Sequence, residues 1–159
     1  MTGILFEIPQ AIDTVGNIFS SRGIKEDRIT LVKGDFLQPF PSNLQPDAAI
    51  LKSIVSTVKS EHLKVIARNI RNTLPMGGKL LVVQSAAPDA CDNSHNETSQ
   101  GYQPGMFAIE VMSFYDNGKI DTVDGWTRYL EEVVVSQGFR INNVLRTEGI
   151  LVLYELTAV

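Results

Sequence analysis

The chain has 159 residues, of which 43% are hydrophobic and 20% are charged, so it is long enough to bury the core of a soluble globular domain. Its net charge is −4, and its lysines and arginines are scattered singly, which argues against a broad nucleic-acid-binding face. One cysteine, Cys91, leaves no internal disulfide, and no apolar run approaches the ~18 residues that span a membrane. We therefore expect one cytoplasmic domain over residues 1–159, without nucleic-acid or membrane partners.

The first third of the chain alternates strand and helix signals. Residues 3–8 predict a strand, and apolar residues then recur at helical spacing over residues 11–19, before the helix-ending Gly23. Residues 28–33 predict a second strand and residues 47–54 a third. The third is apolar enough to be buried on both faces, as strands of parallel sheets usually are.

A longer helix is predicted to follow Ser60, which we expect to cap it, and Glu61 adds an acidic first turn. Its apolar face consists of Leu63, Ile66, Ala67, Ile70 and Leu74. The run Pro75-Met76-Gly77-Gly78 ends this helix, and residues 79–85 predict a fourth strand. Residues 88–104 are rich in Asp, Asn, Ser, Thr, Gln and Gly, and this loop is longer than most connections, so it is the best candidate for a lid.

The last third of the chain predicts two further helices and a hairpin. Residues 106–114 predict one helix, and Thr122 begins another, which Gly138 ends. The apolar stripe of the second helix is Trp126, Tyr129, Leu130, Val133 and Val134, which we interpret as core. Residues 141–146 and 150–156 predict an antiparallel pair joined through Glu148-Gly149. The alternation indicates an α/β fold with a largely parallel sheet and an antiparallel C-terminal edge.

Four stretches follow one another in a fixed order over nearly all of the chain. They are residues 3–9; Gly34-Asp35-Phe36; Leu51-Lys52-Ser53 with residues 69–83; and Gly118-Lys119 with Trp126 and Gly138-Phe139. Their order and spacing resemble the catalytic domain of plant, fungal and bacterial small-molecule O-methyltransferases, the caffeate O-methyltransferase-like family that depends on S-adenosylmethionine. The resemblance implies a Rossmann-like methyltransferase sheet and a role in secondary metabolism.

The family's sheet has seven strands, and its first strand in sequence lies in the middle, between the strands matched by residues 3–8 and 47–54. That strand, the glycine-rich turn after it and an N-terminal helical region have no counterpart in this sequence, so we expect a truncated domain. Strands lie about 4.8 Å apart, so omitting an interior strand leaves a gap of that width or two unpaired edges. We expect the two neighbours to close on each other, a partner such as a full-length relative to donate a strand, or a second copy to cover the edge.

The resemblance also implies cofactor-binding residues. It places Glu7 where an acid binds the ribose hydroxyls of S-adenosylmethionine, Asp35 and Phe36 where the adenine is held, and Lys52 near the amino-acid end. Each has a plain structural alternative: Glu7 as a solvated acid at a strand end, Asp35 as a turn residue after Gly34, Phe36 as core and Lys52 as a solvated cation. These four positions amount to half a cofactor pocket.

Methyl transfer to a hydroxyl also requires a base that removes its proton. The resemblance places Ser56 at the position of the family's catalytic His, and the two acids that orient that His fall on Gln84 and on Ile120 or Asp121. A neutral hydroxyl with no adjacent base does not accept a proton at pH 7. We therefore predict no catalytic residue at these positions and no methyl transfer by the isolated chain.

The two histidines offer no clear replacement for that base. His62 follows Ser60-Glu61 at a helix start and is interpreted as a surface residue, whereas His95 lies in the long polar loop. Asp89, Asp92 and His95 are close in sequence, but polar loops often have this composition, so we predict no metal site.

Three other interpretations of the sequence remain open at this point. The fold could guide an isomerisation or cyclisation of a small aromatic or polyketide-like substrate, which needs shape more than proton transfer. The cavity for that reaction would be lined by Met106, Phe107, Phe114, Tyr115 and Trp126. Alternatively the chain is a non-catalytic subunit that pairs with a complete relative or a second copy through its open sheet edge. A misplaced start codon or a decayed gene copy is the last alternative.

Overall fold

The computed structural model describes residues 2–24, 28–87, 118–147 and 150–159. These residues fall into two compact units, Met1–Pro41 and Ser42–Val159, and each is described by itself. The candidate lid at residues 88–104 and the helix expected at residues 106–114 lie outside the described residues. The single-domain prediction for residues 1–159 stays a prediction.

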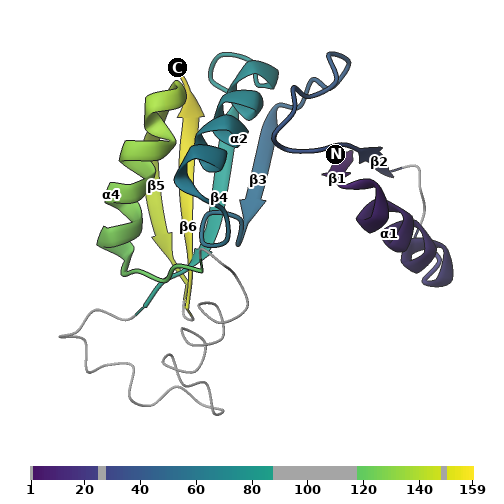
Figure 1. Ribbon diagram of the computed structural model, residues 1–159, viewed down its shortest axis with the longest axis horizontal. Helices are drawn as coiled ribbons and strands as arrows, with labels where there is room; N and C mark the ends of the chain where they lie inside the picture. Colours follow the sequence, from purple (N-terminus) through teal and green to yellow (C-terminus); the bar gives the residue numbers. More distant parts are fainter. Residues whose placement is uncertain (1, 25–27, 88–117, 148–149) are drawn as a thin grey trace, which may run out of the picture. The chain divides into compact units, whose positions relative to one another are not determined.

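The N-terminal unit is a β-α-β unit with a two-stranded parallel sheet (Figure 1). Its elements are β1 (Gly3–Glu7), α1 (Pro9–Ser21) and β2 (Ile29–Lys33). Pro9 occupies the first turn of α1, where its missing N–H costs nothing, and Gly23 follows the helix with φ +63°. The predicted strand–helix–strand order is therefore confirmed, with α1 starting two residues before its apolar stripe.

Aromatic packing holds the N-terminal unit together around Phe6. The ring of Phe6 lies 5.7 Å from that of Phe36 and 4.6 Å from that of Phe40, measured between centroids. Gly34 leaves room for this ring, because a Cβ at that position would lie 2.1 Å from Phe6 Cζ. A larger residue at position 34 would therefore displace the Phe6 ring.

The second unit contains a four-stranded mixed sheet in the order β3-β4-β6-β5. Its strands are β3 (Ala48–Lys52), β4 (Lys79–Ser85), β5 (Phe139–Arg146) and β6 (Leu151–Ala158). β3 and β4 are parallel, whereas β6 is antiparallel to both β4 and β5. The predicted C-terminal hairpin is confirmed, and its second strand returns inside the sheet, which leaves β5 at the edge.

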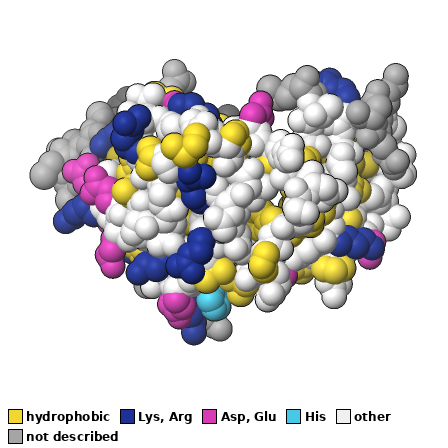
Figure 2. All heavy atoms as spheres, turned by 90° about the horizontal axis from the view of Figure 1, so that it is seen from above, with side chains coloured by type: hydrophobic (Ala, Val, Ile, Leu, Met, Phe, Trp, Pro, Cys, Tyr) yellow, Lys and Arg dark blue, Asp and Glu magenta, His cyan; other side chains and the backbone are white. Residues whose placement is uncertain are grey.

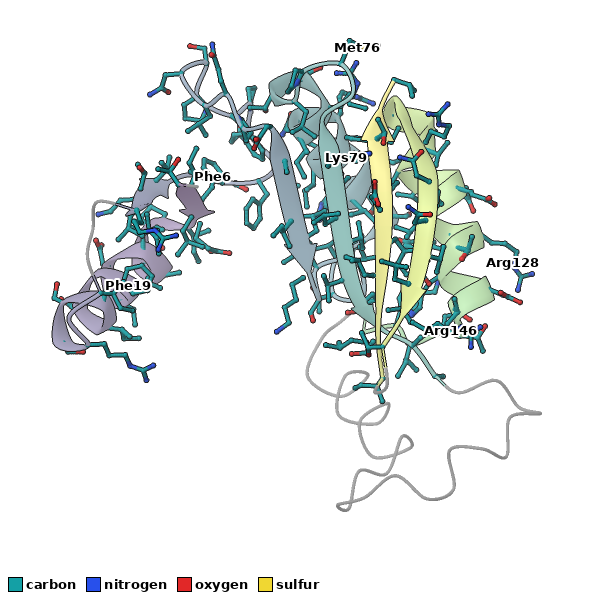
Figure 3. The ribbon with its side chains drawn as sticks, turned by 180° about the vertical axis from the view of Figure 1, so that it is seen from behind. Phe6, Phe19, Met76, Lys79, Arg128 and Arg146 are labelled. Carbon is teal, nitrogen blue, oxygen red and sulfur yellow. The ribbon has the colours of Figure 1, made fainter. Side chains whose placement is uncertain are left out.

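The two α-helices among the described residues of the second unit cover the same face of this sheet (Figures 1 and 3). They are α2 (Ser60–Thr73) and α4 (Val123–Val133), the latter followed by the short 3-10 helix η3 (Val135–Gln137). The largest fully buried side chains are Trp126, Tyr154, Phe139, Leu63, Ile66, Leu80, Leu130, Leu156, Val55, Val82, Val133 and Val134. The core stripes predicted for both helices are confirmed except at the half-buried Tyr129.

Two local predictions in this unit are wrong. Ser60 does not cap α2: Lys59 is the N-cap residue, and the Ser60 hydroxyl donates to the Glu61 carboxylate at 3.4 Å. β3 is not buried on both faces, because Ile50 is 66% exposed while Leu51 is 5% exposed. Alternate residues of a strand point to opposite faces, and the described helices of this unit cover only one of them.

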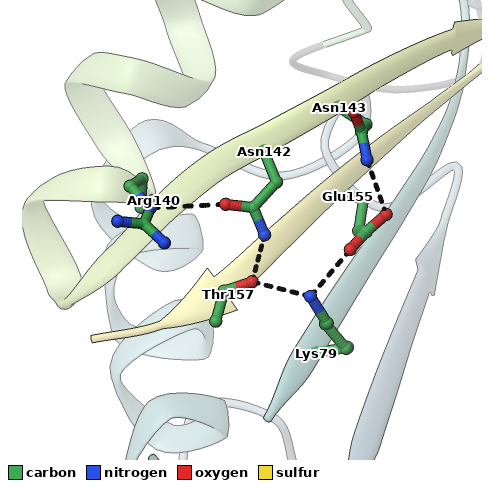
Figure 4. Close-up of polar contacts among 6 residues, drawn as sticks. All are labelled: Lys79, Arg140, Asn142, Asn143, Glu155 and Thr157. Atoms are coloured by element: carbon green, nitrogen blue, oxygen red, sulfur yellow. Dashed lines mark hydrogen bonds and ion pairs between the residues drawn. The ribbon is translucent and has the colours of Figure 1, made fainter. Parts of the chain in front are cut away.

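The sheet face opposite α2 and α4 carries a polar network (Figures 3 and 4). Lys79 Nζ donates to Glu155 Oε1 at 2.8 Å and to Thr157 Oγ1 at 3.0 Å. Asn143 Nδ2 donates to Glu155 Oε2 at 3.1 Å, and Asn142 Nδ2 donates to Thr157 Oγ1. These contacts connect β4, β5 and β6 across the strands.

Candidate functional site

The cofactor-side residues of the N-terminal unit lie at the carboxyl edge of its sheet. β1 and β2 are parallel, so both strands end at this edge, with Glu7 opposite Lys33. The Gly34 N–H continues the ladder by donating to the Glu7 carbonyl at 2.9 Å, and Asp35 and Phe36 follow directly. Ligands of open α/β sheets bind outside the carboxyl ends of the strands, so Glu7, Asp35 and Phe36 are brought together at the expected edge.

The side chains at this edge already have some local partners. Glu7 is half-buried, and its Oε2 accepts the Ile8 N–H at 2.8 Å. Asp35 is exposed, and its Oδ1 accepts the Leu37 N–H at 2.8 Å, so the turn function considered for Asp35 is present. Phe36 is half-buried and contacts Phe6. Cofactor binding by these three residues stays a prediction.

A second group of candidate residues lies at the carboxyl edge of β3 and β4. Lys52 is the last residue of β3 and is exposed. Ser53 follows with φ +58°, a conformation uncommon for residues other than glycine, and its N–H donates to the Val83 carbonyl at 2.9 Å. No local signal predicts this turn, because a serine, Ser53, stands where glycine would be expected.

A short segment connects Ser56 with the end of β4. The Lys119 N–H donates to the Ser56 carbonyl at 3.0 Å, and the Ala87 N–H donates to the Asp121 carbonyl at 2.8 Å. Lys119 and Asp121 are two residues apart, so these bonds bring the Ser56 turn close to the residues that follow β4. Ser56 and the carboxyl end of β4 therefore belong to one site.

The two residues that the resemblance places at the positions of the family's base and acid are buried and uncharged. Ser56 is 4% exposed, and its hydroxyl makes one long bond, donated to the Ser53 carbonyl at 3.4 Å. Gln84 is 3% exposed, and its Oε1 has no hydrogen-bond partner among the described residues. These two positions therefore carry a hydroxyl and an amide, neither of which accepts a proton at pH 7.

Asp121, the alternative second acid, is engaged elsewhere. Its Oδ1 accepts the Thr122 N–H at 2.9 Å, beside the start of α4. A Cβ on Gly125 would lie 1.8 Å from the same oxygen, so the carboxylate packs directly against this first turn. Thr122 completes the turn by accepting the Gly125 N–H through its hydroxyl at 3.1 Å. These contacts give Asp121 a structural function at the helix start.

Lys119 and Tyr129 form a contact that the sequence did not predict. Lys119 Nζ lies 3.8 Å from the centroid of the Tyr129 ring and 5.4 Å from that of Trp126. Burial raises the pKa of Tyr129, and the nearby carboxylates of Glu132 and Glu61 add to the effect. In the sequence, Lys119 was noted only as part of Gly118-Lys119, one of the stretches that resemble the family, and nothing there indicated this cation–π contact.

The remaining described candidates, His62 and Trp126, differ in their exposure to solvent. His62 is exposed, which confirms its interpretation as a surface residue. Trp126 is 0% exposed and donates from Nε1 to the Ser85 carbonyl at 2.9 Å, so its core interpretation is confirmed and it does not line an open cavity. The predictions for His95 and Cys91 lie outside the described residues.

The other residues of two alternatives also lie outside the described residues. They are Met106, Phe107, Phe114 and Tyr115 of the isomerase cavity, and Asp89 and Asp92 of the metal alternative.

Within the described ranges, no group of three or more His, Cys, Asp or Glu side chains is arranged to hold a metal ion. None of the helices in these ranges has the length and apolar character needed to cross a membrane. On the face shown in Figure 2, both basic and acidic side chains are present among uncharged ones.

Comparison with known proteins places these features in a family. Residues 1–140 match the model of the O-methyltransferase domain. Nicotinate N-methyltransferase 1 of Arabidopsis thaliana is 34% identical over 93 residues, which cover 58% of this chain and 23% of that protein. O-demethylpuromycin-O-methyltransferase of Streptomyces alboniger is 25% identical over 148 residues, which cover 93% of this chain and 36% of that protein.

Solved structures show the same fold. The mitomycin 7-O-methyltransferase superposes with a TM-score of 0.76 at 18% identity, covering 100% of this chain and 42% of that one. Human N-acetylserotonin methyltransferase, solved in complex with SAM, superposes with a TM-score of 0.71 at 21% identity, covering 98% of this chain and 40% of that one. The chain thus spans less than half the length of these relatives.

The Rossmann-like α/β fold expected from the sequence is confirmed by these structures, and the family match extends over most of the chain. Relatives named for puromycin, phenazine and mitomycin chemistry agree with the expected link to secondary metabolism. The chain belongs to the O-methyltransferase domain family.

Proposed function

We propose that this chain supplies the C-terminal part of an S-adenosylmethionine-dependent small-molecule methyltransferase domain, and that the isolated chain does not transfer methyl groups to hydroxyl acceptors. The observation that carries the second statement is the pair of buried, uncharged side chains that the resemblance places at the family's base and orienting-acid positions. Ser56 is 4% exposed and Gln84 is 3% exposed, and neither titrates near pH 7.

The chemistry explains why this pair matters. Methyl transfer to a hydroxyl needs the acceptor oxygen in line with the methyl group, and it needs a group that takes the hydroxyl proton. The Ser56 hydroxyl is itself a poor proton acceptor, and the Asp121 carboxylate, the alternative position of the second acid, is bonded to the backbone at the start of α4. Positioning remains available to this site, but proton removal does not.

The cofactor side of the proposal rests on the donor and acceptor groups at the edge of β1 and β2. When bound, S-adenosylmethionine supplies a methyl group on a positively charged sulfur. Glu7 would hold the ribose hydroxyls, because only Oε2 of its carboxylate accepts a described hydrogen bond. Asp35 and Phe36 would hold the adenine, and Lys52, which is exposed, would lie near the amino-acid end.

Two measurements test this proposal. Ligand-observed NMR with S-adenosylhomocysteine should detect binding weaker than about 1 mM, a range set by the contacts present on this chain. Glu7→Gln should weaken that binding, and an undetectable signal from the unaltered chain would contradict the cofactor-side assignment. Mass spectrometry of mixtures containing catechol and S-adenosylmethionine should show no methylated product above background, and product formation would refute the predicted inactivity.

A second candidate function is that of a non-catalytic subunit, and an open strand edge favours it. Within the described strands, β3 is hydrogen-bonded only to β4, at the edge of the four-stranded sheet. An unpaired edge is a template for a strand from another chain, so a full-length relative or a second copy would be the partner. Sedimentation velocity of this chain mixed with such a relative tests this candidate. If the chain is well folded and sediments as a monomer in that mixture, the subunit function is excluded.

A further inference from the structure

The sheet of the second unit carries a continuous apolar band on the face opposite α2 and α4. The strand register sets its members side by side from β3 to β5: Ile50, Leu81, Val83, Leu153 and Leu145, which we call the outer band. Ile50 is 66% exposed and Leu145 is 52% exposed, and the three residues between them are half-buried. No described helix covers this face, which is turned toward the viewer in Figure 3. A contiguous exposed apolar patch is typical of an interaction surface.

Positive charges lie on both sides of the outer band. Lys52 follows the band on β3, and Arg140 precedes it on β5. Because β3 and β5 run in the same direction, these two cations lie on opposite sides of the band. Neither has a carboxylate partner among the described residues, whereas Lys79 is paired with Glu155 at 2.8 Å. The face is therefore positive, although the whole chain has a net charge of −4.

The shape of the outer band suits a helix. It crosses four strands, which at about 4.8 Å between strands gives about 14 Å, the length of roughly ten helical residues. A helix keeps its own backbone hydrogen bonds when it packs on side chains. An extended segment in the same place would lose water from its N–H and C=O groups without gaining partners. Parallel pairs such as β3 and β4 are, in addition, usually covered by helices on both faces.

We infer that the outer band is a docking surface for an amphipathic helix of another protein, with apolar residues on one side and Asp or Glu on both flanks. The apolar residues would cover Ile50 and Leu145, and the acids would pair with Lys52 and Arg140. The surface consists of side chains and is distinct from the unpaired backbone edge of β3. The inference does not depend on cofactor binding or on methyl transfer.

The described helices of a second copy do not have this character. α2 and α4 bury their apolar stripes in their own core. α1 has one acid, Asp13, which pairs with Lys33 at 2.6 Å. Packing the outer faces of two copies together would bring like charges to one interface, which opposes association. Charge complementarity therefore favours a different, acidic partner.

Two designed peptides of about 18 residues test the inference on the full chain. They share one leucine stripe at helical spacing and differ in the flanking residues, which are glutamates in one peptide and lysines in the other. Fluorescence anisotropy of labelled peptides should show the glutamate peptide binding at least about 10-fold more tightly. Equal affinities, tighter binding of the lysine peptide, or no binding of the glutamate peptide would overturn the inference.

Variants locate the surface and leave Lys52 unchanged, because it is also a candidate cofactor residue. Ile50→Lys should weaken binding of the glutamate peptide at least about 10-fold, whereas Ile18→Lys, at an exposed position of α1, should not. Arg140→Glu should reduce the preference for the glutamate peptide to about threefold or less, whereas Arg128→Glu on α4 should leave it intact. If Ile50→Lys fails to fold by circular dichroism, Leu145→Lys takes its place. Unchanged binding by folded variants would overturn the assignment.

Two further measurements separate the other occupants. The chain alone should sediment as a species that Ile50→Lys leaves unchanged, and a dimer that this variant dissociates would make a second copy the occupant. The chain should also not bind phosphatidylglycerol vesicles through this face. Vesicle binding that Ile50→Lys abolishes would identify a membrane surface as the occupant, and either result would overturn the inference.

Discussion

The indole Nε1 of Trp126 donates a hydrogen bond of 2.9 Å to the carbonyl of Ser85 inside the core of the second unit. Trp126 is 0% exposed and Ser85 is 5% exposed, so water reaches neither group freely. The bond joins the middle of α4 to the last residue of β4, directly beside Gln84. The same core residue that closes the helix–sheet interface therefore also fixes the strand end that carries the candidate site.

Trp126→Phe should lower the free energy of unfolding by about 2–4 kcal/mol, because it leaves a cavity and a buried carbonyl without its donor. Urea unfolding followed by circular dichroism measures the change. Glu131→Gln on the exposed side of α4 is the control and should stay within about 0.5 kcal/mol of the unaltered chain. A loss below about 1 kcal/mol for Trp126→Phe would show that the bond and the packing contribute little.

Arg71 connects α2 with two later segments of the second unit. Its guanidinium donates to the backbone oxygens of Leu74 at 3.3 Å, Gly138 at 3.1 Å and Val159 at 2.9 Å. Arg71→Ala should therefore lower the free energy of unfolding by about 1.5–3 kcal/mol, measured in urea. Arg71→Lys should restore less than half of that loss, since an ammonium group cannot reproduce the planar set of donors. Full rescue by lysine would mean that charge, and not geometry, is what matters.

Gly125 lies against Asp121, which leads to a test of coupling. Alanine normally stabilises a helix by about 1 kcal/mol relative to glycine, but a Cβ at position 125 would overlap the Asp121 carboxylate. Gly125→Ala should therefore lower the free energy of unfolding by about 1–3 kcal/mol. In an Asp121→Ala background the same change should be neutral or stabilising. Equal effects in both backgrounds, from a double-mutant cycle, would contradict the contact.

Much of the fold was predictable because its signals are local. Apolar residues at helical spacing identified α2 and α4, since those stripes face the core, and Gly23 and Gly138 marked turns with positive φ. The exposure of Ile50 was not predictable, because the pattern of β3 does not tell how many faces of the sheet are covered. The position of β6 between β4 and β5 depends on long-range pairing, which no local pattern encodes.

The candidate site was predictable in its residues but not in its contacts. The family resemblance located Ser56 and Gln84, and burial agrees with an interior position for both. The unpaired Gln84 Oε1 follows from the three-dimensional arrangement of its neighbours, which sequence spacing does not reveal. The Lys119–Tyr129 contact was missed for the same reason, because Lys119 precedes α4 and Tyr129 lies within it, and the two side chains meet only in the folded chain.

The last prediction concerns pH and the polar network of Figure 4. The bond from Lys79, followed by that from Asn143, lowers the pKa of Glu155 below its ordinary value of 4.5. A carboxyl group whose pKa is lowered by folding stabilises the protein above the unfolded pKa, and this contribution is lost as the pH falls through the folded pKa. Glu155→Gln should therefore reduce the free energy of unfolding at pH 6–7 and have a smaller effect below about pH 4, in urea titrations. Lys79→Met should remove most of the same pH dependence, because Lys79 is its main cause. A Glu155→Gln effect that is constant from pH 3 to 7 would show that the ionised carboxylate contributes nothing to folding.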